Sequence, residues 1–161
     1  MIRSNRKISL IASCATVFLC VLITNLCQAQ EQDPVLWKVI TKKVDDRTYE
    51  VRLRAILRPP WHIYAQDVAE GVALPTTISF EKNPLLQLLG SIKEEGKLEE
   101  KTVDDIPLKY YSRQVDFIQQ VKLKAAVKTS LKGNINFMIC THERCKPPAD
   151  KGFTIILDGA N

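Results

Sequence analysis

Hydrophobic and polar residues alternate with a period of two along most of the chain after Trp37. Runs rich in Val, Ile, Thr and aromatic residues are separated by Pro, Gly, Asn and Asp, and no long stretch has the period of a helix. In the clearest run, 49–57, the apolar residues fall on one face: Tyr49, Val51, Leu53, Ala55 and Leu57. Such a strand has one buried and one solvated face. The pattern predicts an all-β domain.

Further strands are expected at 61–64, 76–80, 115–127, 135–140 and 153–157. About seven short strands in about 130 residues predict an immunoglobulin-like sandwich of two sheets. The segment between Glu94 and Tyr110 is polar and acidic, and we interpret it as a long loop or an irregular hairpin. Loops of this length are often lids or binding loops, although a solvated excursion has the same composition.

The N-terminus has the layout of a secretory signal peptide. Arg3, Arg6 and Lys7 precede an apolar run over 8–27, and a polar stretch follows Ala29. We therefore expect a signal peptide over 1–29 and one exported domain over 30–161. Two alternatives remain: an uncleaved membrane anchor, since 20 apolar residues just span a bilayer, and lipid attachment at Cys14. All three place the domain outside the cytoplasm, and we expect it in the periplasm.

Removal of this segment changes the charge and the cysteine count. Its three basic residues account for part of the formal net charge of +5, which falls to +2. Binding to nucleic acid or to an acidic membrane surface therefore has no support. Three of the five cysteines also lie in the segment, so the exported domain keeps only Cys140 and Cys145. In an oxidising compartment these two should form a disulfide.

The residues around this pair suggest that the disulfide is reactive. Alternation places Ile135, Phe137 and Ile139 on the core face and Cys140 on the opposite face, away from the core. A structural disulfide of the immunoglobulin type lies inside the sandwich instead. A bridge that closes only about six residues stabilises a fold by roughly 2 kcal/mol, against about 4.7 kcal/mol for a loop of 100 residues. An outward-facing bridge of this kind suits exchange with a partner thiolate.

Exchange needs an accessible sulfur and a leaving thiolate that nearby positive charge stabilises. His142 and Arg144 are candidate modulators that carry such charge, and Asp104 and Asp105 of the acidic segment are further candidates. We interpret His62 as a structural histidine.

A metal site is the competing interpretation of the same segment. Met138, Cys140, His142 and Cys145 include the soft ligands that Cu(I) prefers. Their spacing matches no standard zinc module. We expect neither a metal nor a cofactor other than the redox-active disulfide.

At this point the chain resembles a known family. The matching residues are Trp37 after Asp33-Pro34-Val35, Trp61-His62-Ile63-Tyr64, Pro75 with Ile78-Ser79-Phe80, Tyr111 with 115–123, Gly133, and 137–148. The family is that of the N-terminal periplasmic domain of the thiol-disulfide interchange protein DsbD, also called the disulfide bond corrector domain. The match extends over nearly all of the exported domain.

The resemblance implies an immunoglobulin-like sandwich in which Cys140 and Cys145 are catalytic. Cys145 would form the mixed disulfide with a partner, and Cys140 would resolve it. A cap loop within 97–110 would cover the pair, with Ile106 and Leu108 where such caps often present an aromatic residue. Electrons would come from a membrane thiol-disulfide carrier and pass to periplasmic thioredoxin-like proteins. The chain carries neither partner, so we expect both in trans.

The sequence thus predicts a thiol-disulfide oxidoreductase of the protein-disulfide reductase type. The alternative is an immunoglobulin-like binding module with an inert structural disulfide, because sandwiches host many unrelated functions. The direction of electron flow, and whether cytochrome maturation or disulfide repair benefits, stay open at this stage.

Overall fold

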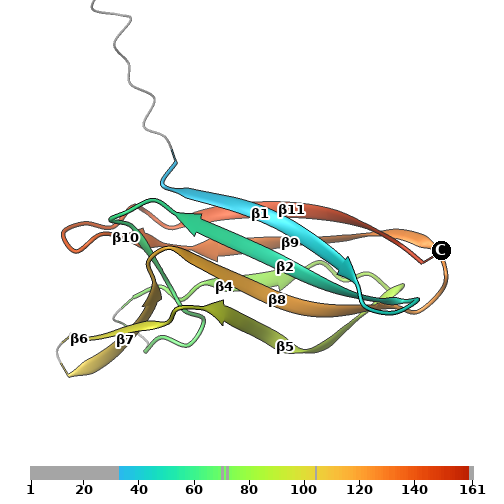
Figure 1. Cartoon of the computed structure of the whole chain (residues 1–161), viewed down its shortest axis with the longest axis horizontal. Helices are drawn as coiled ribbons and strands as arrows, with labels where there is room; N and C mark the ends of the chain where they lie inside the picture. The colour runs from blue at the N-terminus through green and yellow to red at the C-terminus, as the bar shows by residue number, and fades with distance from the viewer. Residues whose placement is uncertain (1–32, 70, 72, 104, 160–161) are drawn as a thin grey trace, which may run out of the picture. The chain divides into compact units, whose positions relative to one another are not determined.

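The computed structural model describes residues 33–69, 71, 73–103 and 105–159 (Figure 1). Within these ranges the chain forms strands and turns and no helix, and consequently no helix able to cross a membrane, so the all-β prediction is confirmed. Residues 33–161 form a compact unit separate from residues 1–32. The expected signal peptide, the anchor and the lipidation alternative all lie outside the described residues.

Two antiparallel sheets form the sandwich, as Figure 1 shows. The first has the order β1 (Val35–Lys43), β2 (Thr48–Leu57), β8 (Gln114–Leu123) and β5 (Leu86–Gly96). The second has the order β11 (Ala149–Asp158), β9 (Lys128–Phe137) and β4 (Thr77–Phe80). The alternation predicted for 49–57 is correct, because Val51, Leu53, Ala55 and Leu57 are all buried.

Aromatic side chains join the two sheets in the main core. The ring of Trp37 on β1 lies 6.0 Å from that of Phe117 on β8 and 5.3 Å from that of Phe137 on β9, centre to centre. Phe117 and Phe137 are almost fully buried. Large aromatic rings contribute most to such a core because each removes a large apolar area from water.

A charged network lies on the outer face of the first sheet. Asp116 is only 3% exposed and accepts hydrogen bonds of 2.7 and 2.8 Å from Arg54, with Arg52 a further 3.3 Å contact. The hydrogen bonds from Arg54 hold the pKa of Asp116 below its usual value, and those from Arg52 act in the same direction. A buried carboxylate needs such partners.

A third sheet, which the sequence did not predict, lies at one end of the sandwich. Its order is β10 (Ile139–Cys140), β3 (His62–Tyr64), β7 (Ile106–Tyr111) and β6 (Glu99–Val103). Most of the acidic segment 94–110 is therefore a hairpin rather than a long loop, since β6 pairs with β7 along its whole length. Its turn contains Asp105, whose φ is 64°.

Two predicted strands differ from the observed ones. The run expected at 115–127 ends at Leu123, and the run expected at 135–140 is two strands, β9 and β10, separated at Met138. The chain changes sheets at this break: β9 pairs with β11 and β4, whereas β10 pairs with β3. The break is what brings Cys140 into the third sheet.

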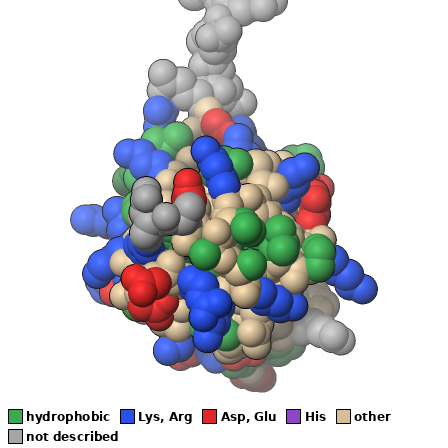
Figure 2. Space-filling model, turned by 90° about the vertical axis from the view of Figure 1, so that its right-hand side faces the viewer, with side chains coloured by type: hydrophobic (Ala, Val, Ile, Leu, Met, Phe, Trp, Pro, Cys, Tyr) green, Lys and Arg blue, Asp and Glu red, His purple; other side chains and the backbone are tan. Residues whose placement is uncertain are grey.

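Figure 2 shows the opposite end of the sandwich, at which the β1–β2 and β8–β9 turns lie. Lys and Arg side chains surround a group of hydrophobic ones, and no histidine is visible on this face. Val44 and Val127, in these two turns, are 53% and 39% exposed. The Cys140–Cys145 disulfide and His62 lie at the other end, at the third sheet.

We expect Gly133→Ala to destabilise the domain. A Cβ at Gly133 on β9 would lie 2.3 Å from the backbone oxygen of Ser79 and 2.5 Å from the ring of Phe153, so β4 and β11 would have to shift. Overpacking of this kind costs about 1–3 kcal/mol. Urea unfolding measures the loss. Gly152→Ala on the adjacent β11 is the matched control, because its Cβ meets nothing within 4 Å; equal stability losses in the two variants would contradict the packing argument.

Candidate functional site

The two cysteines face each other across a short hairpin. Cys140 ends β10, and Cys145 pairs with it as an isolated antiparallel bridge. On one side of this pair the amide of Thr141 donates to the carbonyl of Arg144 (2.7 Å), and on the other the amide of Lys146 donates to the carbonyl of Ile139 (2.9 Å). The cysteines are therefore a non-hydrogen-bonded pair, the position at which opposite side chains come closest. The structure joins them in a disulfide, with Cα atoms 3.9 Å apart.

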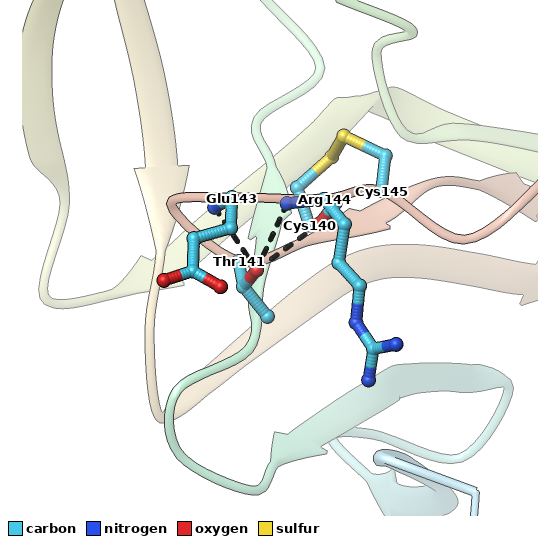
Figure 3. Close-up of a disulfide and its surroundings, with 5 residues drawn as sticks. All are labelled: Cys140, Thr141, Glu143, Arg144 and Cys145. Atoms are coloured by element: carbon cyan, nitrogen blue, oxygen red, sulfur yellow. Dashed lines mark hydrogen bonds between the residues drawn. A yellow bond between two sulfur atoms is a disulfide. The ribbon is translucent and has the colours of Figure 1, made fainter.

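A threonine hydroxyl organises the turn of this hairpin (Figure 3). The Oγ1 of Thr141 accepts hydrogen bonds from the amides of Glu143 and Arg144, each 3.1 Å long. It also donates to the carbonyl of Arg144 over 3.3 Å. Threonine side chains that bond to the backbone two or three residues on are a recurrent way of fixing a turn.

The two cysteines differ in exposure. Cys145 is an exposed residue, whereas Cys140 is only 1% exposed. The prediction that Cys140 points away from the main core is correct, but the inference that it faces solvent is wrong. A second apolar cluster covers it, in which Tyr64 and Leu108 are also buried. The physical reason is the third sheet, whose β3 and β7 supply those two side chains.

A cavity of about 290 Å³ opens beside the disulfide. Its lining residues come from β3, the β6–β7 hairpin and the disulfide hairpin: His62, Tyr64, Lys101, Val103, Leu108, Tyr110, Thr141, His142, Glu143, Arg144 and Cys145. The exposed cysteine is thus part of the cavity wall. The other lining residues combine apolar side chains with several cationic ones.

Both histidines of the chain line this cavity. The ring of His62 lies 6.0 Å from that of His142 and 4.7 Å from that of Tyr110, centre to centre. Burial lowers the pKa of His62, and the charge of His142 lowers it further. Lys101 acts in the same direction, and Glu99 opposes it. These surroundings favour the neutral form of His62 over its charged form.

Two cations lie over the ring of Trp61. The guanidinium of Arg144 is 5.7 Å and the ammonium of Lys146 is 5.6 Å from the centre of the Trp61 ring. Cation–π contacts of this length hold the side chains near the ring. Both residues adjoin Cys145 in sequence, but their cationic groups lie over Trp61, a residue of the main core, and Figure 3 shows the Arg144 guanidinium directed away from the disulfide.

The structure brings together most of the residues that the sequence proposed for the site. His142 and Arg144 line the cavity with Cys145. Asp105 lies in the β6–β7 turn and is not among the lining residues, and Asp104 lies outside the described residues. Over the described part of the chain no group of three or more His, Cys, Asp or Glu side chains is arranged to hold a metal ion.

The lining residues that sequence reasoning missed include His62, Tyr110 and Lys101. His62 was interpreted as structural, yet it lies directly opposite Cys140 in the β10–β3 register. The only signal for it was its place in the Trp61–Tyr64 segment of the family resemblance. All three residues lie on strands of the third sheet, which the sequence did not predict as a sheet.

Comparison with solved structures identifies the fold. The N-terminal periplasmic domain of ScsB from Proteus mirabilis aligns with a TM-score of 0.55 at 16% identity, over 81% of this chain and 49% of that one. The reduced N-terminal domain of DsbD from Neisseria meningitidis aligns with a TM-score of 0.51 at 18% identity, over 83% of this chain and 93% of that one. The fold is that of the DsbD N-terminal domain.

The chain spans about half the length of the ScsB structure that it matches. No protein-family model and no curated protein matches it. At these identities the likeness to DsbD and ScsB establishes the immunoglobulin-like fold, and function must be argued from the site that the fold carries.

The lowered pKa of His62 predicts a dependence of stability on pH. Because its folded pKa is below the unfolded value of about 6.5, the unfolded chain binds more protons below that pH, and the free energy of unfolding falls as pH falls. An NMR titration of the His62 ring checks the shift directly. The variant His142→Gln should raise the pKa of His62 only part of the way to its unfolded value, because the effect of burial remains. Titration of wild-type His62 at or above its unfolded value would contradict the assignment.

The burial of Cys140 predicts unequal reactivity in the reduced protein. Iodoacetamide should modify Cys145 well before Cys140, as mass spectrometry of the alkylated peptides would show. Leu108→Ala removes a side chain that packs with Cys140 and should accelerate its alkylation. Leu98→Ala is the control, since Leu98 is 46% exposed just before β6. Equal rates for the two cysteines in the wild-type protein would mean that the second cluster does not protect Cys140.

Proposed function

We propose that the protein is a periplasmic thiol-disulfide exchange module that relays reducing equivalents to thioredoxin-like proteins through Cys140 and Cys145. The observation that carries the proposal is the asymmetry of the pair: Cys145 is exposed in a cavity wall, and Cys140 is 1% exposed directly across the hairpin. An attacking sulfur needs access, and a resolving sulfur needs only proximity to its partner. The two positions meet these separate requirements.

The reaction begins with the reduced pair. The Cys145 thiolate attacks one sulfur of an oxidised partner, so that a mixed disulfide forms and the partner's other sulfur leaves as a thiolate. The Cys140 thiolate then attacks the Cys145 sulfur, forms the Cys140–Cys145 bond and releases the second partner thiolate. Two electrons pass to the partner, whose disulfide becomes a dithiol. Cys140 and Cys145 together lose two thiol protons, and the two partner thiolates take up two.

The position of the bridge supports exchange over a structural role. A structural disulfide of the immunoglobulin type joins the two sheets inside the core. Here Cys140 belongs to the second cluster with Tyr64 and Leu108, outside the main core. The main core packs without either cysteine, so opening the bridge leaves it intact.

Cationic side chains in the cavity that contains Cys145 also favour the chemistry. Lys101 and His142 line this cavity together with Cys145. Positive charge stabilises the thiolate that attacks and the thiolate that leaves.

The β6–β7 hairpin is proposed as the cover of the site. Val103, Leu108 and Tyr110 from this hairpin line the cavity that contains Cys145. A partner that approaches Cys145 through this cavity would contact the hairpin, which makes it the element that a docking protein would displace.

Partners and location belong to the same proposal. The expected signal peptide and the fold shared with a periplasmic domain of ScsB support export to the periplasm. We propose a membrane thiol-disulfide carrier as the electron donor and thioredoxin-like proteins as acceptors, both in trans.

Single cysteine variants test the assigned roles. With an oxidised thioredoxin-like protein, Cys140→Ser should accumulate a mixed disulfide through Cys145, visible on a non-reducing gel. Cys145→Ser should form none, because Cys140 is buried. Equal trapping by both variants would contradict the roles. If the bridge is reactive, its loss should cost only about 2 kcal/mol and the reduced domain should stay folded. Unfolding of the wild-type domain on reduction, together with the absence of any adduct, would therefore favour the binding module with an inert disulfide.

A further inference from the structure

The disulfide hairpin has an unusual turn. His142 and Glu143 occupy its two central positions, and neither is Gly, Pro or Asn. Two-residue hairpin turns that match the twist of their strands need a positive φ in one or both central residues. Among the described non-glycine residues only Asp105 has a positive φ, so the 141–144 turn is not of the twist-matched kind. Its stability therefore depends on other bonds.

The side chain of Thr141 supplies those bonds. Its hydroxyl accepts from two amides of the turn and donates to the carbonyl of Arg144, as Figure 3 shows. Apart from the backbone bonds that flank the cysteines, these are the contacts that close the turn. None of these bonds involves a sulfur atom.

We propose that Thr141 is a positioning residue whose hydroxyl keeps Cys140 and Cys145 opposite each other while the bridge is open. This inference rests on the exchange function proposed above. When Cys145 is bonded to a partner, no disulfide joins the two sides of the hairpin. The buried Cys140 must nevertheless stay within reach of the Cys145 sulfur, and the closed turn keeps it there.

The same geometry sets the equilibrium between dithiol and disulfide. A turn closed in the reduced form raises the effective concentration of one sulfur at the other, which favours the bridge. Without the hydroxyl, the reduced hairpin can relax, whereas the oxidised hairpin is still held by the covalent bond. Loss of the hydroxyl thus favours the reduced form and moves the reduction potential to a less negative value.

Equilibration of the purified protein with glutathione tests the inference. Thr141→Val keeps the shape of the side chain and removes the hydroxyl, and Thr141→Ala is a second variant without it. For both we expect the equilibrium constant for bridge formation to fall about threefold to tenfold, the effect of losing about one net hydrogen bond. This equals a shift of about 14 to 30 mV for a two-electron couple. Thr141→Ser retains the hydroxyl and should keep the wild-type constant.

Thr129→Val is the matched control away from the site. It removes a hydroxyl on β9 that accepts a 3.0 Å hydrogen bond from Asn83, and it should leave the equilibrium constant unchanged. A purely structural role for Thr141 would lower the unfolding free energy of the oxidised and reduced forms equally and leave the constant unchanged. That result, or an equal shift in Thr141→Ser, would overturn the inference.

The outcome is separable from that of the proposed function, because glutathione equilibration needs no protein partner. A shifted constant in a protein that forms no adduct with thioredoxin-like proteins would contradict only the exchange function. A wild-type constant in Thr141→Val and Thr141→Ala, with normal trapping by Cys140→Ser, would contradict only the positioning role.

Discussion

The antiparallel pairing of β10 with β3 is the interaction on which the site depends. It places Ile139 opposite Ile63, on the side of the main core, and Cys140 opposite His62, on the side of the second cluster. Alternation along a strand then makes the outcome unavoidable: if Ile139 is in the main core, Cys140 cannot be. The third sheet in turn covers Cys140 with Leu108 and leaves Cys145 at the surface.

Because of the same pairing, the residues that stabilise the sandwich are different from those that carry the proposed chemistry. The sandwich is held by an apolar core that includes Phe117 and Phe137, with Trp37 packed against it, and neither cysteine belongs to this core. The disulfide hairpin is held by its own backbone bonds and by the hydroxyl of Thr141. A bond that neither element needs for its shape can be broken and remade during a reaction cycle.

The sequence predicted the sandwich well because period-two alternation reports directly on strands with one buried face. In β2 every second residue is apolar, and each predicted core position from Val51 to Leu57 is buried. The alternation of Ile135, Phe137 and Ile139 likewise placed Cys140 off the main core. The cysteine pair was found because only two cysteines follow the expected signal peptide.

The third sheet escaped prediction for equally physical reasons. The strands β3 and β10 are only three and two residues long, too short for a periodic pattern. In β6 three of the five residues are charged, because an edge strand with little burial needs no apolar face. The burial of Cys140 and the position of His62 opposite it follow from this sheet, so neither could be predicted from alternation alone.

The reduction potential of the Cys140–Cys145 bridge, measured while circular dichroism monitors the fold, tests the central claim most directly. The account predicts a value within the range of exchange proteins, roughly −120 to −270 mV, with the β-sheet signal retained after reduction. A potential well below roughly −300 mV, or loss of the sheet signal on reduction, would mark the bridge as structural and contradict the account.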